Sequence, residues 1–206
     1  MRSVLVTSFE PFGGHPRNAS LEVALALAQS PMDDIVLDAV VLPVVAGVCA
    51  EVAWRRIEQT RPDLVLAMGQ AGGSTHIRLE DRAVNLDHFT APDNAGFVRQ
   101  QRIIADGPES LPAAVDIERV LIEVRRAKFA VQHSLSAGRY VCNHLYYQLL
   151  HRRRSASNFG TLFVHLPYLP EQVPVGRWMP SMELAEQVAC VRAVIAGCLG
   201  DAREER

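Results

Sequence analysis

Three short apolar runs constrain the fold most strongly, because a glycine-rich or polar turn follows each of them. The runs occupy residues 4–6, 64–68 and 161–165. Continuous apolar runs are typical of strands that are buried on both faces of a parallel sheet. Further strands are expected at 35–42 and 131–135, and helices at 21–28, 48–57, 117–126, 143–153 and 182–199. This alternation predicts an α/β fold, a three-layer α/β/α sandwich with a twisted, mostly parallel mixed sheet.

The length and charge of the chain indicate one globular domain. Its 206 residues suit a single domain over residues 1–200 with a polar tail at 201–206. Residues 74–112 have weak periodicity, which favours irregular strands and loops. A formal net charge of −2 provides no positive field for nucleic acid or an anionic membrane. Because the sequence has neither a signal-like start nor an 18-residue apolar segment, we expect a cytoplasmic protein that does not span a membrane.

Four cysteines are spread along the chain, and one of them has an unusual position. Cys49, Cys142, Cys190 and Cys198 show no C-x-x-C spacing, so we expect reduced thiols and no zinc site. Cys142 lies between a glycine-bearing turn and an apolar helical run. A thiol at a helix N-terminus is favoured as thiolate, and the free amides there can stabilise an oxyanion. Cys142 is therefore the candidate nucleophile, with a buried structural cysteine as the alternative.

A histidine at the end of the last predicted strand is the candidate partner of this thiol. In α/β sheets, sites form beyond the carboxyl ends of strands, which here places the loops 9–14, 69–73, 136–141 and 166–170 together. His165 ends the last apolar run and could serve as general base and acid. A core histidine bonded to the backbone is the alternative. His144 resembles half of a metal site but has no obvious companion ligands.

A cysteine–histidine pair works better with a third group that orients the imidazole ring. Glu80 is the candidate for that role. Position in the sequence does not by itself choose Glu80 over Asp81 or Asp87. An exposed glutamate in a surface salt bridge is the ordinary alternative.

Four motifs occur in the same order as in one known family. They are residues 7–14 (TSFEPFGG) with 18–20 (NAS), 69–73 (GQAGG), 136–147 (SAGRYVCNHLYY) and 164–172 (VHLPYLPEQ). A weaker fifth combines 77–85 (IRLEDRAVN) with 91–96 (APDNAG). On these motifs the chain resembles the pyroglutamyl peptidases, also called pyrrolidone carboxyl peptidases.

The resemblance implies a cysteine exopeptidase that removes N-terminal pyroglutamyl residues from peptides through a thioester acyl-enzyme. It implies an α/β/α sandwich, no cofactor and no metal, and a homo-oligomer, since prokaryotic-type members are often tetramers. In this family pattern Cys142 corresponds to the nucleophile, His165 to the general base and acid, and Glu80 to the residue that orients the ring. Phe9 and Phe12 match pocket-lining phenylalanines.

Two further positions belong to the pocket that the resemblance implies. Gln70 matches the glutamine that faces the lactam, and Tyr140 stands where the family often has phenylalanine. Core packing of Phe9 and Phe12, and solvation of Gln70 in a loop, are the alternatives.

Three departures from the family pattern fall near the candidate site. Asp81 adds a carboxylate beside Glu80, Arg139 replaces a threonine in the glycine turn, and Ala91 replaces a larger apolar residue. They leave two other functions open: a catalytically impaired or binding-only homologue, and a hydrolase of another small N-acyl or lactam substrate.

Overall fold

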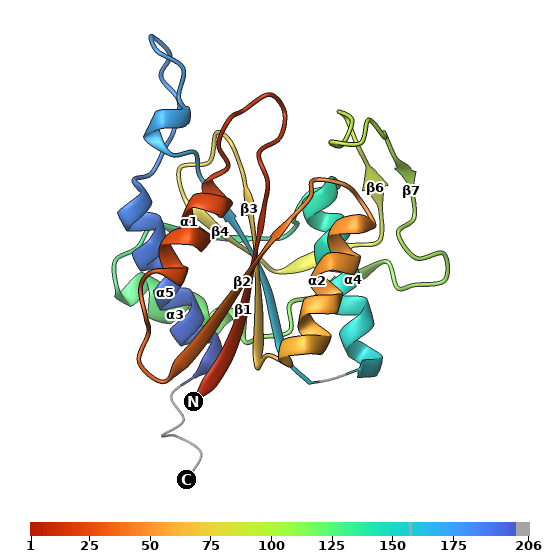
Figure 1. Cartoon of the computed structure of the whole chain (residues 1–206), viewed down its shortest axis with the longest axis horizontal. Helices are drawn as coiled ribbons and strands as arrows, with labels where there is room; N and C mark the ends of the chain where they lie inside the picture. Colours follow the sequence, from red (N-terminus) through yellow and green to blue (C-terminus); the bar gives the residue numbers. More distant parts are fainter. Residues whose placement is uncertain (157, 201–206) are drawn as a thin grey trace.

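The computed structural model of the chain describes residues 1–156 and 158–200, and the predicted tail at 201–206 lies outside them. A central sheet has the strand order β2-β1-β3-β10-β4-β9, with helices on both faces (Figure 1). Its strands are β1 (Arg2–Phe9), β2 (Ile35–Leu42), β3 (Leu64–Gln70), β4 (Ile77–Glu80), β9 (Val131–Ser134) and β10 (Gly160–Leu166). The helices are α1 (Ala19–Ala28), α2 (Val48–Thr60), α3 (Ile117–Arg126), α4 (Val141–Ala156) and α5 (Leu184–Leu199).

The directions of the strands define the edge at which a site can form. Strands β2, β1, β3 and β10 are mutually parallel, so their carboxyl ends meet at the upper edge in Figure 1. Strand β4 pairs antiparallel with β10, and β9 is parallel to β4. The predicted mostly parallel mixed sheet is therefore confirmed.

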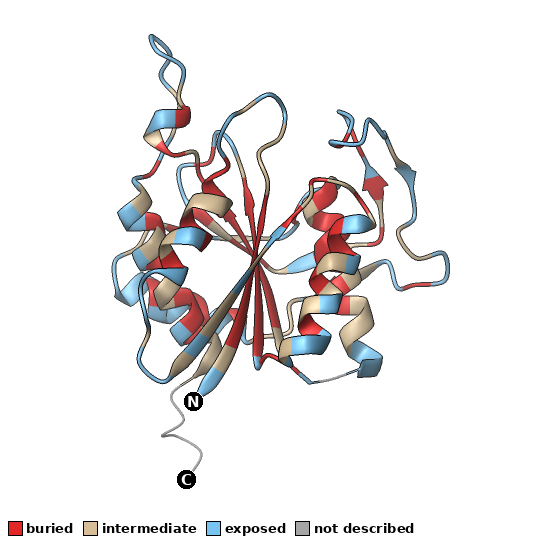
Figure 2. Cartoon of the chain, in the orientation of Figure 1, coloured by how far each residue is buried: buried red, intermediate tan, exposed pale blue. Residues whose placement is uncertain are grey.

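Two apolar layers, one on each side of the sheet, hold the helices in place. One core cluster joins α1, α3 and α5 to one face, and the other joins α2 and α4 to the opposite face. Figure 2 shows the buried residues concentrated in the sheet and on the helix sides that face it. The predicted three-layer α/β/α sandwich is confirmed.

The segment predicted as irregular strands and loops contains one strand of the central sheet. Two small antiparallel pairs also form here: β5 (Arg82–Val84) with β8 (Ser110–Pro112), and β6 (Asp87–His88) with β7 (Gln100–Gln101). Strand β4 enters the central sheet between β10 and β9. Strand β4 lies in the segment whose periodicity is weak, so its place in the sheet had to come from the tertiary structure.

Helix α4 differs from the prediction at its N-terminal end, which carries Cys142. It was expected at 143–153 but begins at Val141, so Cys142 is its second residue rather than the residue before it. The backbone N–H of His144 donates to the Tyr140 carbonyl at 3.0 Å and closes the first turn. The apolar pattern of a helix locates its buried stripe, whereas its first turn depends on hydrogen bonds that the pattern does not report.

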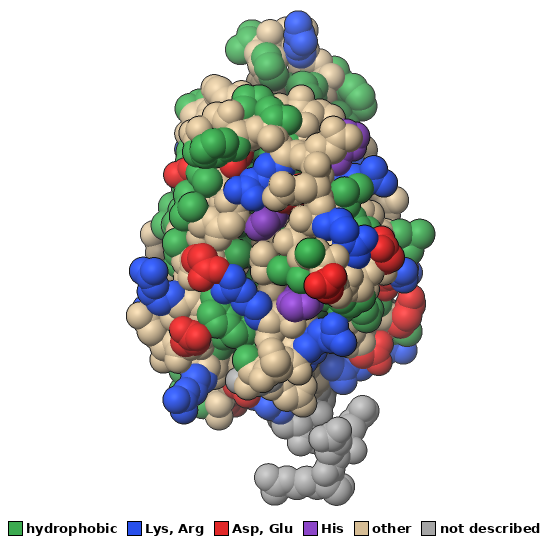
Figure 3. Space-filling model, turned by 90° about the vertical axis from the view of Figure 1, so that its right-hand side faces the viewer, with side chains coloured by type: hydrophobic (Ala, Val, Ile, Leu, Met, Phe, Trp, Pro, Cys, Tyr) green, Lys and Arg blue, Asp and Glu red, His purple; other side chains and the backbone are tan. Residues whose placement is uncertain are grey.

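On the face shown in Figure 3, positive and negative side chains are interspersed rather than gathered by sign. Within residues 1–156 and 158–200, no helix combines the length and the apolar character that a bilayer crossing requires.

Candidate active site

His165 and Glu80 contact each other on the sheet face that α4 covers. In the antiparallel pair of β10 and β4, Glu80 is opposite Phe163, two residues before His165. The His165 Nδ1–H donates to Glu80 Oε1 over 2.8 Å, and both side chains are buried. The Tyr146 hydroxyl, from α4, donates to the Glu80 carbonyl at 3.1 Å and fixes the strand below the carboxylate. The hydrogen bond to Glu80 thus orients the imidazole through Nδ1.

The strand geometry explains which of the three candidate carboxylates reaches His165. Asp81 follows the last residue of β4, and its carboxylate lies toward His133, the register partner of Leu79, on the face opposite to Glu80. Its carboxylate contacts Arg82 at 2.8 Å and His133 at 3.4 Å. Asp87 contacts His144 instead. Of the three, Glu80 is the carboxylate that lies against His165.

Cys142 lies over the strand next to His165. A Cβ built on Gly69 would come within 2.9 Å of the Cys142 Sγ, so the sulfur rests directly on the Gly69 backbone. Gly69 of β3 is the register partner of His165 of β10. The absence of a side chain at Gly69 is what lets the thiol approach the sheet beside the imidazole.

The loop before Cys142 reaches the site by a route that was not predicted. Residues 136–141 were expected to follow a strand whose carboxyl end lies at the common edge, but β9 runs antiparallel to β10. The chain turns back after β9, and α4 begins beside the ends of β1 and β3. Its position is shown by the pocket that Tyr140 and Val141 share with Phe9 and Gln70. The loops meet at the predicted edge of the sheet. The direction of β9, which precedes residues 136–141, is opposite to the predicted one.

The electrostatics favour a protonated imidazole beside the thiol. Burial lowers the pKa of His165, but hydrogen bonds to Cys142 and Glu80, together with their negative charge, outweigh it and raise this pKa from 6.5 to about 9. At neutral pH the ring therefore holds a proton that it can deliver to a leaving group. The first amides of α4, which precede the bond from His144 to Tyr140, have no intrahelical acceptor and are free to bind an oxyanion.

All four residues predicted for substrate binding line one small pocket with Cys142. The lining residues are Phe9, Phe12, Asn18, Val44, Gln70, Tyr140, Val141 and Cys142. Gln70 Oε1 accepts from the Ala19 N–H and from Gln172 Nε2, both at 2.8 Å. With its oxygen held in this way, Gln70 presents its amide N–H₂ as a donor. Tyr140 packs on Phe89, with ring centroids 4.7 Å apart, and its hydroxyl donates to the Pro92 carbonyl.

Three pocket residues were not predicted as site residues: Asn18, Val44 and Val141. Asn18 caps α1, because its side-chain oxygen accepts from the Ser20 N–H at 3.0 Å. Its position in the loop after β1 brings it to the pocket as well. Val44 follows β2, whose carboxyl end lies at the same edge. The rule that located the other loops, applied to residues 43–44, would have found it.

His144 uses its ring in two hydrogen bonds within the fold. Its Nδ1–H donates to Asp87 Oδ2 at 2.8 Å, and its Nε2 accepts from the Gly47 N–H at 3.0 Å. Both ring nitrogens are thereby used. Over residues 1–156 and 158–200, no three His, Cys, Asp or Glu side chains are grouped as metal ligands.

Comparison with known proteins assigns the chain to a family. A family model described as pyroglutamyl peptidase matches residues 2–200. The chain belongs to the pyroglutamyl peptidase family. A pyrrolidone-carboxylate peptidase of Cupriavidus taiwanensis is 37% identical over 211 residues, covering 100% of this chain and 98% of the relative. A relative of the same name from Levilactobacillus brevis is 38% identical over 93% of this chain and 97% of its own length.

Solved structures of the same family share the fold. Pyrrolidone carboxyl peptidase of Fervidobacterium islandicum superposes with a TM-score of 0.90 at 38% identity, covering 95% of this chain and 97% of the other. The enzyme of Thermococcus litoralis gives a TM-score of 0.92 at 28% identity and covers 100% and 97%. The chain is accordingly a cysteine peptidase, as predicted from its motifs.

The departures from the pyroglutamyl peptidase pattern lie outside the pocket. Asp81 points to the other face of the sheet, as described above. Arg139 and Ala91 are exposed, and neither is among the residues that line the pocket. These positions therefore give no structural reason for a binding-only or impaired protein.

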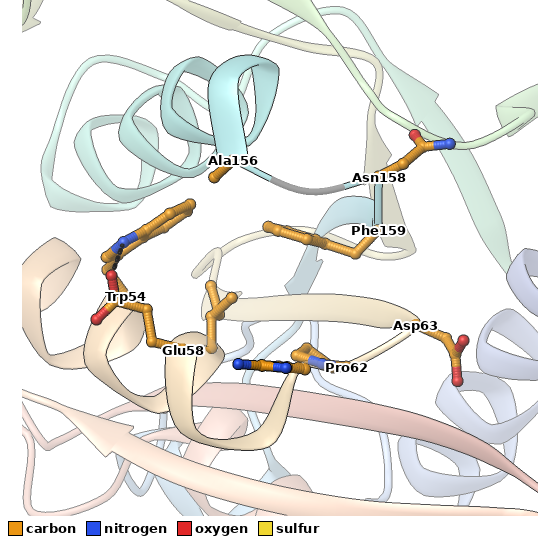
Figure 4. Close-up of a pocket in the computed structure, with 9 residues that line it drawn as sticks. Trp54, Glu58, Pro62, Asp63, Ala156, Asn158 and Phe159 are labelled. Atoms are coloured by element: carbon orange, nitrogen blue, oxygen red, sulfur yellow. Dashed lines mark hydrogen bonds between the residues drawn. The ribbon is translucent and has the colours of Figure 1, made fainter.

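A larger hollow of about 450 Å³ lies at the opposite end of the sheet and is not the active site (Figure 4). It lies between the end of α2 and the start of β10, where Trp54 and Phe159 form part of its wall. The Trp54 Nε1–H already donates to Glu58, and Asp63 accepts from the Ser3 backbone. None of the predicted catalytic or binding residues reaches it.

Proposed function

We propose that this chain hydrolyses the peptide bond that follows an N-terminal pyroglutamyl residue, with Cys142 as nucleophile. The observation that carries the proposal is the position of the Cys142 sulfur on Gly69, beside the imidazole that Glu80 orients and against the pocket lined by Phe9. Membership of the pyroglutamyl peptidase family supports the choice of substrate.

The reaction proceeds in two halves. The Cys142 thiolate attacks the pyroglutamyl carbonyl, and the amides at the start of α4 receive the developing oxyanion. The C–N bond then breaks while the His165 imidazolium gives its proton to the departing amine. A water molecule, deprotonated by His165, attacks the thioester, and pyroglutamate leaves as the thiolate forms again. Glu80 holds the ring through Nδ1 in both halves.

The pocket suits a flat, uncharged lactam. Phe9, Phe12 and Tyr140 provide apolar walls, and Gln70 provides an amide donor for the lactam carbonyl. The cavity measures about 10 Å³, less than the ring requires, so the walls must separate on binding. Phe12 is the wall that can move, because it is half-buried, whereas Phe9 is buried and Tyr140 is held by Phe89 and the Pro92 carbonyl.

We also propose a compartment and an oligomeric state for the protein. Residues 1–200 act as a single domain on peptides that begin with pyroglutamate, and the protein works in the cytoplasm as a homo-oligomer. The four cysteines are all free thiols, which supports a reducing compartment. The oligomer is what the resemblance to the family implies.

Selective loss of activity at one thiol tests the mechanism. We expect Cys142→Ala to release no coumarin above background from pyroglutamyl-7-amino-4-methylcoumarin, while its circular dichroism and melting temperature match the parent. Iodoacetamide should inactivate the parent enzyme at neutral pH. Burial raises the pKa of Cys198 to about 12, so Cys198→Ser should remain active and equally sensitive to alkylation. Turnover by Cys142→Ala would contradict the assignment.

A further inference from the structure

Four residues form a row across the sheet on the face that α4 covers, and this row gives the substrate a direction. Gly69 of β3 pairs with His165 of β10, His165 pairs with Arg78 of β4, and Arg78 pairs with Gln132 of β9. Paired residues on neighbouring strands direct their side chains to the same face. The neighbours Ile77 and Leu79 belong to the core on the opposite face, as the alternation requires.

The pocket and the catalytic groups occupy one end of this row. The pocket residues follow β1, β2 and β3, Cys142 lies over Gly69, and His165 is one strand further. A substrate whose lactam fills the pocket and whose carbonyl meets Cys142 must extend its leaving peptide past His165. The next strand in that direction is β4, about 4.8 Å away, and the residue it presents there is Arg78.

Arg78 has no partner of its own in the part of the chain that the structure describes. Its Nε is buried without a hydrogen bond, and its guanidinium forms none of the ion pairs found among residues 1–156 and 158–200. The side chain as a whole is half-buried, so its terminal nitrogens reach the surface beside the site. A buried donor without an acceptor is costly, and a carboxylate would satisfy it in a charge-assisted, bidentate pair.

We propose that Arg78 is a specificity-determining residue that binds a carboxylate on the residue following pyroglutamate. One extended residue spans about 3.4 Å, so that residue, whose amine takes the proton from His165, brings its own carboxylate to the level of β4. The carboxylate comes either from an acidic side chain or from the free C-terminus of a pyroglutamyl dipeptide. This inference rests on the proposed function and adds to it a preference on the leaving side.

A panel of four substrates tests the preference and separates the two sources. Pyroglutamyl-Glu amide and pyroglutamyl-Gln amide differ by the side-chain charge, and pyroglutamyl-Ala acid and pyroglutamyl-Ala amide differ by the terminal charge. We expect kcat/KM to be about tenfold higher for the acidic member of at least one pair, mainly through a lower KM. Higher salt should reduce the ratio, because an ion pair near the surface is screened.

Four variants at three arginines identify the residue responsible. In Arg78→Gln the acidic-to-neutral ratio should fall to about one, and Arg78→Lys should recover part of it, since lysine keeps the charge but not the bidentate geometry. Arg82→Gln removes the same charge nearby, from a side chain already paired with Asp81, and should keep the ratio. Arg139→Gln, near Cys142 but exposed and outside the row, should keep it too.

The outcomes distinguish this inference from the proposed function. Turnover of all four substrates with no preference in either pair, or a preference that survives Arg78→Gln or disappears in Arg139→Gln, would overturn the role of Arg78 and leave the peptidase assignment intact. Failure of the parent enzyme to cleave any of the four would contradict both. Melting temperatures of all variants confirm that each ratio comes from folded protein.

Discussion

At the scale of single residues, the adjacent carboxylates of Glu80, the last residue of β4, and Asp81, which follows it, have unrelated roles. Glu80 is fully buried and accepts from His165, whereas Asp81 contacts Arg82 and His133 on the other face. The pKa of His165 is raised to about 9 partly because of the Glu80 hydrogen bond and charge. Since the raised pKa belongs to a cation, the imidazolium is present below about pH 9 and is lost as the pH rises through that value.

Glu80→Gln should therefore lower kcat/KM at least tenfold and move the alkaline limb of its pH profile from about pH 9 to lower pH. The direction follows because glutamine keeps a hydrogen-bond acceptor but removes the negative charge that favours the imidazolium. The measurement is a pH profile of coumarin release at low substrate concentration. Asp81→Asn is the matched control, with activity within about twofold and an unchanged limb. An equal shift in both variants would contradict the assignment of Glu80.

At the scale of elements, the site depends on how closely the start of α4 approaches β3. A Cβ at Gly69 would come within 2.9 Å of both the Cys142 sulfur and the Phe163 ring. Gly69→Ala must therefore displace one of them. Because misplacement of a reacting group by about 1 Å costs about a hundredfold in rate, we expect kcat to fall by about 10- to 100-fold while the fold persists.

Gly197→Ala is the matched control for that change. Gly197 lies in α5, where a Cβ would meet Val120 at 3.4 Å, which is ordinary contact. Alanine is also the better helix former. Activity should be unchanged, as measured by kcat on the same coumarin substrate. Parent-like kcat in Gly69→Ala would show that the position of the Cys142 thiol does not require a residue without a side chain at position 69.

At the scale of the whole molecule, His144 ties together three distant parts of the chain. From α4 it donates to Asp87, in the loop-rich segment, and accepts from Gly47 at the start of α2. Its side chain and that of Asp87 are both buried. Removing the ring leaves the Asp87 carboxylate buried without its partner.

His144→Ala should consequently lower the free energy of unfolding by about 3–5 kcal/mol. Urea denaturation followed by circular dichroism measures this change. His133→Ala is the control: His133 also contacts an aspartate, Asp81, but its side chain is 29% exposed. Its loss should cost less than about 1 kcal/mol. Similar losses of unfolding free energy in the two variants would show that the buried hydrogen bonds of His144 do not stabilise the fold more than an exposed contact does.

Local patterns predicted most of the elements and failed where pairing was distant. The bounds of β2 and α3 agree with the prediction, because apolar periodicity within ten residues reports a buried face directly. Strand β4 could not be placed in the central sheet, since its contact with β10 joins residues more than eighty positions apart. The start of α4 was predicted two residues too late, because the sequence does not report the hydrogen bond from His144 to Tyr140 in the first turn.

The sequence alone determined the sandwich and the family resemblance, and it proposed Cys142 and His165 as the candidate thiol and histidine, because these follow from apolar patterns and from motifs that are continuous in the chain. The tertiary structure decided which carboxylate orients His165, how α4 reaches the site, and which residue of β4 lies beside His165 on the leaving side. Those three points depend on the antiparallel entry of β4 into the sheet. That pairing puts Glu80 under the imidazole, turns Asp81 away, and brings Arg78 beside His165. No local pattern specifies it, because strand pairing is set by contacts across the whole fold.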